Sequence, residues 1–170
     1  MQDAAVLVTG AARRIGAVVA RRLHGAGARV ALHYHRSRNE AESLCAELAA
    51  RRPGSCIAVR ADLLDVPSIE RLVAEVGEAF GRLDGLVNNA SSFYATPFGA
   101  IGEREWKDLM GTNLRAPLFL AQAAAGRLRE ARGTIVNVID IHAERPLKDF
   151  TVYSVAKAGL AGLTRALAME

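Results

Sequence analysis

Residues 6–16 read Val-Leu-Val-Thr-Gly-Ala-Ala-Arg-Arg-Ile-Gly, and this stretch decides the fold class of the chain. The apolar run at 6–8 predicts a short buried strand, and a helical pattern begins at residue 14. Gly10 permits a tight turn between them, and Gly16 lets the helix lie close to the sheet. Such a turn can present backbone N–H groups to a pyrophosphate, although a plain strand-to-helix turn has the same outline. Arg14 stands where the usual dinucleotide-binding pattern has its middle glycine, and its guanidinium can reach a phosphate or an anionic substrate edge.

Strand-like and helix-like segments alternate along the rest of the chain. The predicted strands are short and apolar, at residues 6–8, 30–32, 57–59, 86–87 and 135–138. The predicted helices are residues 14–25, 38–51, 66–80, 103–131 and 151–169. This alternation indicates an α/β fold with a parallel sheet, and no linker or repeat divides residues 1–170 into two domains. A ligand site is expected at the carboxyl ends of the strands, beside the loop at 91–102.

The composition argues against several classes of protein. Hydrophobic residues make up 51% of the 170 residues and charged residues 24%, which favours a folded core over disorder. The net charge is +4, but the Arg residues are scattered among acids and few aromatic residues accompany them, so no nucleic-acid partner is expected. No apolar run is long enough to cross a membrane. Cys45 and Cys56 form no CxxC pair, so we expect neither a disulfide framework nor a metal site, and a reduced cytoplasmic location.

The last predicted strand leads to an expectation about the length of the chain. Ile135, Val136, Val138 and Ile139 are strongly apolar, and without a neighbouring strand they would form a bare sheet edge that is prone to aggregation. We therefore expect residues 1–170 to be the N-terminal part of a longer chain that adds strands here. On that view, residues 1–170 alone would be poorly soluble or inactive.

The segment after the second strand, Tyr34-His35-Arg36-Ser37-Arg38, contains no acid before Glu40. An acid here usually binds the ribose of NAD, whereas Arg36, Ser37 and either His35 or Arg38 suit the 2′-phosphate of NADP. A solvated basic loop is the alternative interpretation. Together with the glycine turn, the segment favours NADPH/NADP+ as the cofactor. The cofactor should also meet residues after strands three and four, namely Asp62 and Leu63 beside the adenine and Asn88, Asn89 and Ala90 beneath it.

Tyr153 and Lys157 are spaced to lie on one face of the last predicted helix. The phenol of Tyr has a pKa near 10, which is too high for ready proton exchange at neutral pH. An ammonium about 4 Å away contributes on the order of 4 kcal/mol at an effective dielectric near 20. That energy corresponds to about three pKa units, so Lys157 is expected to lower the pKa of Tyr153 toward neutrality.

These motifs together resemble the short-chain dehydrogenase/reductase family over the whole chain, and within it the pteridine reductases. The family resemblance lies in the glycine turn, Asp62, Asn88-Asn89-Ala90, Asn113, Tyr153 and Lys157. The similarity to pteridine reductases lies in Arg14, in His33-Tyr34-His35-Arg36-Ser37 and in Asn89-Ala90-Ser91-Ser92-Phe93-Tyr94. The resemblance implies one Rossmann-type, doubly wound NADP-binding domain with strand order 3-2-1-4-5, and a homotetramer. The implied cofactor-binding residues are Gly10, Arg14, Ile15, Gly16, Tyr34, His35, Arg36, Ser37, Asp62, Leu63, Asn89, Ala90, Ser91, Tyr153 and Lys157.

Asp140 precedes Tyr153 by 13 residues, where most of the wider family carries a serine. A serine there hydrogen-bonds a carbonyl oxygen, whereas a carboxyl group can exchange a proton with a ring nitrogen. The resemblance therefore implies NADPH-dependent reduction of a dihydropterin, or of dihydrofolate, to the tetrahydro form, with Phe93 stacked on the pterin ring. The implied catalytic residues are Asp140, Tyr153, Lys157 and Asn113, and the implied substrate-binding residues are Arg14, Ser91, Phe93, Asp140 and Tyr153.

Two other functions stay open. One is a general carbonyl or 3-oxoacyl reductase of the same family, against which Arg14, Phe93 and Asp140 argue. The other is an NADP-binding regulatory protein without turnover. Under either of these two functions, Asp140 would only cap a turn and Phe93 would only cover the core.

Pro117 has a predictable effect on the helix at 103–131. Because Pro117 lacks an N–H group, the carbonyl of Asn113 loses its helical partner. We hypothesise that this carbonyl holds a water that leads to Lys157, and a simple helix kink is the alternative. His24 and His142 have no partners at metal-ligand spacing, so no metal role is expected for them.

Overall fold

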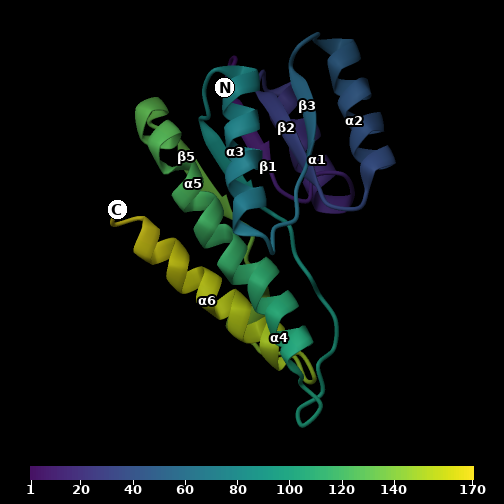
Figure 1. The fold of residues 1–170 in the computed structure, drawn as a ribbon, viewed down its shortest axis with the longest axis vertical. Coiled ribbons are helices and arrows are strands. Elements are labelled where there is room, and N and C mark those ends of the chain that lie inside the picture. Colours follow the sequence, from purple (N-terminus) through teal and green to yellow (C-terminus); the bar gives the residue numbers. More distant parts are fainter.

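A computed structural model describes all residues from 1 to 170, and its centre is a five-stranded parallel sheet (Figure 1). The strands are β1 (Ala5–Val8), β2 (Arg29–Tyr34), β3 (Cys56–Arg60), β4 (Gly85–Asn88) and β5 (Thr134–Asn137). Their order is β3-β2-β1-β4-β5, which confirms the predicted order. Each predicted strand is present with its bounds shifted by no more than two residues, because short apolar runs flanked by glycine and polar residues mark buried strands well.

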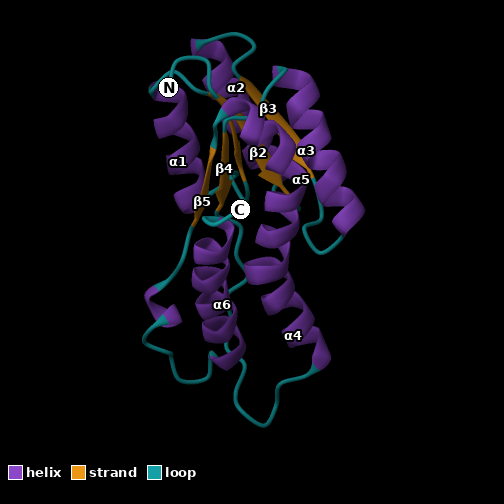
Figure 2. Ribbon diagram, turned by 90° about the vertical axis from the view of Figure 1, so that its left-hand side faces the viewer, coloured by secondary structure: helices purple, strands orange, loops and turns teal.

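Helices cover both faces of the sheet, as Figure 2 shows. Six α-helices are present: α1 (Arg14–Gly25), α2 (Arg38–Arg51), α3 (Val66–Phe80), α4 (Glu103–Met110), α5 (Ala116–Ala131) and α6 (Thr151–Leu167). On one face, Leu44 and Leu48 of α2 join Leu32 and residues of α1 in a core cluster. On the other face, the apolar sides of α3 and α5 pack on Leu7 and Leu86 of the central strands. Burial on both faces explains why the strands read as continuous apolar runs.

The boundaries of α3 show how local sequence sets a helix. Asp65 accepts a hydrogen bond from the N–H of Ser68 over 3.0 Å, and Pro67 lies in the first turn. Gly81 ends the helix in the left-handed region at φ 71°. A side-chain acceptor before the first turn, an early proline and a terminal glycine are the expected start and stop signals.

The predicted helix over 103–131 is interrupted, and this is a correction. Between α4 and α5 lies a π-helical segment, η1 (Gly111–Arg115), in which the N–H of Ala116 bonds the carbonyl of Gly111. Pro117 cannot supply the N–H that an α-helix needs, so the chain widens by one residue before it. The segment buries Asn113, which is 1% exposed.

The sheet ends at β5, and the loops beyond its carboxyl edge extend away from it beside α4 and α6 (Figures 1 and 2). Val136 on β5 is 50% exposed, in agreement with the predicted edge strand. None of the helices combines the length and the apolar character that a membrane-spanning segment requires.

Candidate functional site

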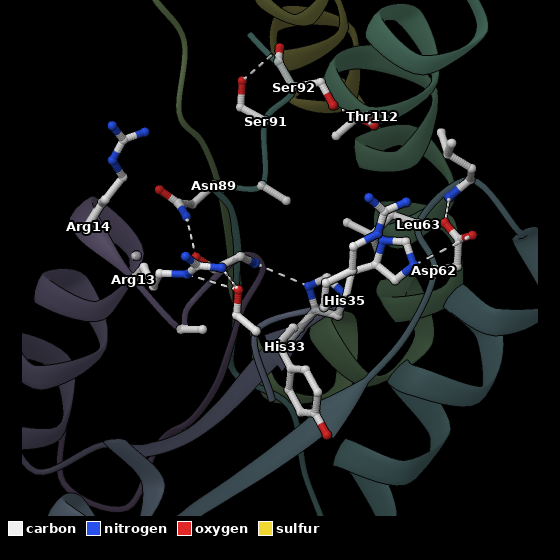
Figure 3. A pocket seen from close by; sticks show the side chains of 18 of the residues that line it. Arg13, Arg14, His33, His35, Asp62, Leu63, Asn89, Ser91, Ser92 and Thr112 are labelled. Carbon is white, nitrogen blue, oxygen red and sulfur yellow. Dashed lines mark hydrogen bonds and ion pairs between the residues drawn. The ribbon is translucent and has the colours of Figure 1, made fainter. Parts of the chain in front are cut away.

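A cleft of about 840 Å³ opens at the carboxyl edge of the sheet (Figure 3). Its walls come from the turn after β1, the loops after β2, β3 and β4, and from α4 and η1. The cleft is lined by Gly10, Ala12, Arg13, Arg14, Ile15, Gly16, His33, Tyr34, His35, Arg36, Ser37, Asp62, Leu63, Leu64, Asn89, Ala90, Ser91, Ser92, Tyr94, Arg104, Asp108 and Thr112. Most of the residues expected to hold a cofactor therefore share one cleft. Four of them do not line it: Arg38, Asn88, Tyr153 and Lys157.

The backbone conformation of the glycine turn explains why glycine occupies positions 10 and 16. Gly10 lies in the left-handed region at φ 61°, and Arg14 lies there too, at φ 52°. Arg14 thus adopts a conformation that favours glycine, which is the residue of the usual pattern at this position. Gly16 has no room for a side chain, because a Cβ there would lie 2.6 Å from Nδ2 of Asn89 and closer still to the carbonyl of Gly10.

Two side chains hold the turn in place, one on β2 and one just after the end of β4. Nδ1 of His33 accepts the N–H of Gly10 over 3.1 Å, and Nε2 lies 3.2 Å from the carbonyl of Ala61. These partners require the proton on Nε2, and burial lowers the pKa of His33 to about 4, so the ring is neutral. Nδ2 of Asn89 donates to the carbonyls of Thr9 and Gly10 over 2.8 and 3.2 Å.

The basic side of the cleft contains a residue that sequence reasoning missed. Nε of Arg13 donates to Oγ of Ser37 over 2.9 Å and lies 3.3 Å from Glu40. Because Arg13 and Ser37 lie in different loops, their contact cannot be read from the sequence. The only hint in the sequence is that two arginines stand next to each other in the turn. Arg38, considered as a phosphate ligand, instead pairs with Glu42 over 2.7 Å.

The cleft has the chemistry that suits a phosphate-bearing dinucleotide. No side chain caps the N-terminus of α1, so the first N–H groups of that helix stay available at the cleft. Arg13, Arg14 and Arg36 line the same cleft. The only acidic residues in its lining are Asp62, which faces His35 at 4.0 Å, and Asp108. These residues fit a nicotinamide dinucleotide with a phosphate on its ribose.

Beside the cleft, Tyr153 and Asp140 form a hydrogen-bonded pair. Oη of Tyr153 donates to Oδ2 of Asp140 over 2.8 Å. Oδ1 of Asp140 accepts the backbone N–H of His142 over 3.0 Å and so caps the short 3-10 helix η2 (Ile141–Ala143). Asp140 therefore caps a turn, as one interpretation of it expected, and also accepts a hydrogen bond from Tyr153; its proton exchange with a ring nitrogen stays a prediction.

The pKa of Tyr153 is raised, and the predicted lowering by Lys157 is wrong. Burial raises the pKa of Tyr153, and the hydrogen bond to the Asp140 carboxylate raises it further, while the nearby Ser91 side chain opposes them. Nζ of Lys157 donates to the carbonyl of Val138 over 2.9 Å and lies 5.7 Å from the centre of the Tyr153 ring. The ammonium is thus turned toward the loop after β5, and burial lowers its own pKa. The pKa of Asp140 is lowered, chiefly by the hydrogen bond from the backbone N–H of His142.

Ser91, in the lining of the cleft, bonds to the buried side chain of Asn113. Its Oγ donates to Oδ1 of Asn113 over 2.7 Å, and Nδ2 of Asn113 donates to the carbonyls of Ser92 and Leu109, each over 2.9 Å. The side chain of Asn113 therefore joins the loop after β4 to the π-helical segment. The water relay from the carbonyl of Asn113 stays a prediction.

Phe93 lies over Tyr153 in an aromatic cluster. Its ring stacks on Phe150 with centroids 4.5 Å apart and meets Tyr153 edge-on at 4.8 Å. The side chain of Phe93 is still 53% exposed, so an aromatic face remains open to a ligand. Phe150, just before α6, was not singled out from the sequence. No group of three or more metal-ligating side chains is found together in the structure.

The sequence of the chain is similar to those of known proteins. Residues 4–170 match the model of the family described as short chain dehydrogenase. The chain is 42% identical over 202 residues to Pteridine reductase 1 of Leishmania tarentolae, covering 96% of this chain and 70% of that protein. It is 34% identical to a 3-oxoacyl-[acyl-carrier-protein] reductase FabG of Staphylococcus aureus, with 96% and 67% covered. It is 41% identical to an L-rhamnose 1-dehydrogenase (NAD(P)(+)) of Azotobacter vinelandii, with 98% and 67% covered.

Proposed function

Because the chain belongs to the short-chain dehydrogenase family of oxidoreductases, we propose that it uses NADPH to reduce a dihydropterin to the tetrahydropterin, with dihydrofolate as a second substrate. Residues 1–170 form one NADP-binding domain in this proposal. The observation that carries it is the pair formed by Tyr153 and Asp140, 2.8 Å apart. Reduction of a C=N bond needs a proton on nitrogen, and a carboxyl group next to a phenol can exchange one.

The cleft residues have separate binding tasks in this proposal. The turn from Gly10 to Gly16 and the open N-terminus of α1 bind the pyrophosphate. Arg36, Ser37 and Arg13 bind the 2′-phosphate, since no acid follows β2 to take the ribose hydroxyls. The bound cofactor supplies a hydride to the ring carbon of the substrate.

Tyr153 and Asp140 supply the proton to the ring nitrogen. At neutral pH, Asp140 is ionised because its pKa is lowered, and Tyr153 keeps its proton because its pKa is raised. The pair thus holds one proton between two oxygens, next to the open face of Phe93. A pterin stacked on that ring would place its edge near the pair. Lys157 anchors the loop that carries Asp140 through the carbonyl of Val138.

The proposal is tested by the substrate that drives NADPH oxidation. The purified protein is offered dihydrobiopterin, an acetoacetyl thioester and, with NADP+, L-rhamnose. We expect turnover of the pterin, and a loss on the order of 100-fold or more in the Asp140→Ser variant because one half of the pair that transfers the proton is removed.

Each other outcome contradicts the proposal in its own way. Turnover of the thioester, retained or improved in Asp140→Ser, would identify a carbonyl reductase. Turnover of L-rhamnose alone would identify a sugar dehydrogenase. Binding of NADPH without turnover of any of the three would favour a non-catalytic role.

A further inference from the structure

We propose that Asp108, on α4, is a positioning residue that fixes the loop carrying Phe93 and thereby sets pterin affinity; this rests on the proposed pterin reduction. The other acidic residue of the cleft lining, Asp62, faces His35 and the backbone of its own loop. Asp108 forms no ion pair within 4.0 Å, and its partners are hydroxyl groups. No role for it follows from the motifs recognised in the sequence.

The contacts of Asp108 hold the residue that precedes Phe93. Oγ of Ser92 donates to Oδ1 of Asp108 over 3.1 Å. Oγ1 of Thr112, one helical turn along from Asp108, approaches the same carboxylate at 3.5 Å. The Asp108 carboxylate also raises the pKa of Tyr94, on the other side of Phe93. One side chain on α4 therefore binds Ser92 and influences Tyr94, the two sequence neighbours of the aromatic residue.

The loop around Phe93 has attachments on both sides. Residues 89–95 form no regular secondary structure. Nδ2 of Asn113 holds the carbonyl of Ser92, Asp108 holds its hydroxyl, and the next backbone link is the bridge between Thr96 and Phe150. Phe93 lies between these attachments and contacts the rings of Phe150 and Tyr153. Releasing the Ser92 hydroxyl from α4 would loosen the loop just before Phe93 and let its ring shift relative to Tyr153.

The surroundings of Tyr94 keep its hydroxyl group protonated. Burial and the nearby carboxylate raise the pKa of Tyr94 to about 12, so its hydroxyl stays protonated at physiological pH.

The test compares Asp108→Ala, Asp108→Asn and Glu103→Ala in the protein. Asp108→Ala removes the acceptor, whereas Asp108→Asn retains a side-chain oxygen for Ser92. Glu103→Ala removes an exposed carboxylate from the same helix, where it pairs only with Lys107, and serves as the matched control. We expect KM for dihydrobiopterin to rise about tenfold in Asp108→Ala, the equivalent of one charge-assisted hydrogen bond, with KM for NADPH little changed.

The conservative variant and the control decide whether the role is specific. Asp108→Asn should recover most of the pterin affinity, and Glu103→Ala should behave as wild type. An equal rise in both KM values, or no recovery in Asp108→Asn, would overturn the proposal. Should Asp108→Ala fail to fold, Ser92→Ala removes the donor that Asp108 binds. This variant should raise KM for the pterin by a smaller factor, and no rise would overturn the proposal.

Hydrogen exchange separates this inference from the proposed function. Amide exchange in residues 91–96 is measured without substrate, and it should become faster in Asp108→Ala but not in Glu103→Ala. Unchanged exchange would refute the attachment by Asp108 whatever the enzyme reduces. A wild-type protein that reduces no pterin, but shows the faster exchange in Asp108→Ala, would refute the substrate and leave the attachment standing.

Discussion

Asp140 accepts a hydrogen bond from the hydroxyl of Tyr153 with one carboxylate oxygen and caps η2 with the other. The two bonds link the helix that carries Tyr153 to the loop that follows β5. The ring of Tyr153 in turn meets the half-exposed ring of Phe93 edge-on at 4.8 Å. The following expectations depend on this site and on the turn after β1.

The pH dependence of pterin reduction should report on Asp140. Its pKa is lowered, so its protonated fraction at neutral pH is small and rises about tenfold for each pH unit toward acid. If Asp140 passes on the proton, kcat/KM for dihydrobiopterin rises as the pH falls from about 8 to 5. Asp140→Asn should flatten this profile. A flat wild-type profile would show that Tyr153 donates without Asp140.

Folding stability sets the lower limit of that pH range. A carboxyl whose pKa is lowered on folding stabilises the folded state above its unfolded pKa, near 3.9, and loses this contribution as the pH falls through the folded value. We therefore expect the protein to be less stable at acid pH, and Asp140→Asn to lose less stability there. Thermal unfolding at each pH, measured beside the rates, checks both expectations.

A side chain at position 16 should disrupt the glycine turn. In Gly16→Ala the new Cβ would meet the carbonyl of Gly10, the amide of Asn89 and, at 3.0 Å, Cα of Ala11. Two of these atoms belong to the backbone and cannot move aside cheaply, so we expect a loss of about 1–3 kcal/mol in unfolding free energy. NADPH affinity should fall as well. Urea denaturation and a fluorescence titration measure the two effects.

Gly25→Ala is the matched control for this substitution. Gly25 ends the same helix, and a Cβ there would have no neighbour within 4 Å. Its unfolding free energy should stay the same or rise by up to about 1 kcal/mol, because alanine is the better helix former. Equal losses in both variants would contradict the steric explanation.

Replacement of Arg14 should separate stability from binding. Arg14→Gly relieves a left-handed backbone at φ 52° but adds freedom to the unfolded chain. The net change in unfolding free energy should therefore be small, about 1 kcal/mol or less in favour of the variant. Binding of NADPH or of the pterin should weaken, because the guanidinium is lost from the cleft.

Arg132→Gly provides the control for Arg14→Gly. Arg132 has the same left-handed backbone, at φ 51°, but lies at the end of α5 outside the cleft. The variant should show the same small change in stability and unchanged binding. Weakened binding in Arg132→Gly, or unchanged binding in Arg14→Gly, would show that the side chain of Arg14 has no part in the site.

Arg13 should contribute to the choice between NADPH and NADH. The Arg13 guanidinium lies between Ser37 and Glu40, where it would offset the charge of Glu40 against a 2′-phosphate. Arg13→Ala is expected to raise the Kd of NADPH about tenfold or more and to leave the Kd of NADH nearly unchanged. Arg38→Ala, whose side chain pairs with Glu42, should change neither. Equal weakening for both cofactors would contradict a role at the 2′-phosphate.

The sequence by itself determined the order of elements, the parallel sheet and the position of the glycine turn. These features follow from local properties: the spacing of apolar residues, the missing side chain of Gly16 and the missing N–H of Pro117. Even so, the interruption at Gly111–Arg115 was predicted only as a kink. The missing N–H of Pro117 shows where the α-helical hydrogen bonds must stop. It does not show that the chain forms a wider turn there, in which Asn113 bonds to the loop after β4.

Only the tertiary structure decided how the charged and polar groups of the site pair. The sequence placed Tyr153 and Lys157 on one helix, but the ammonium bonds the carbonyl of Val138 and the phenol bonds Asp140, so the pKa of Tyr153 rises rather than falls. The pairing of Arg13 with Ser37 was equally hidden. Electrostatic and hydrogen-bond energies depend on distances between groups that are far apart in the chain, and those distances exist only once the elements have packed.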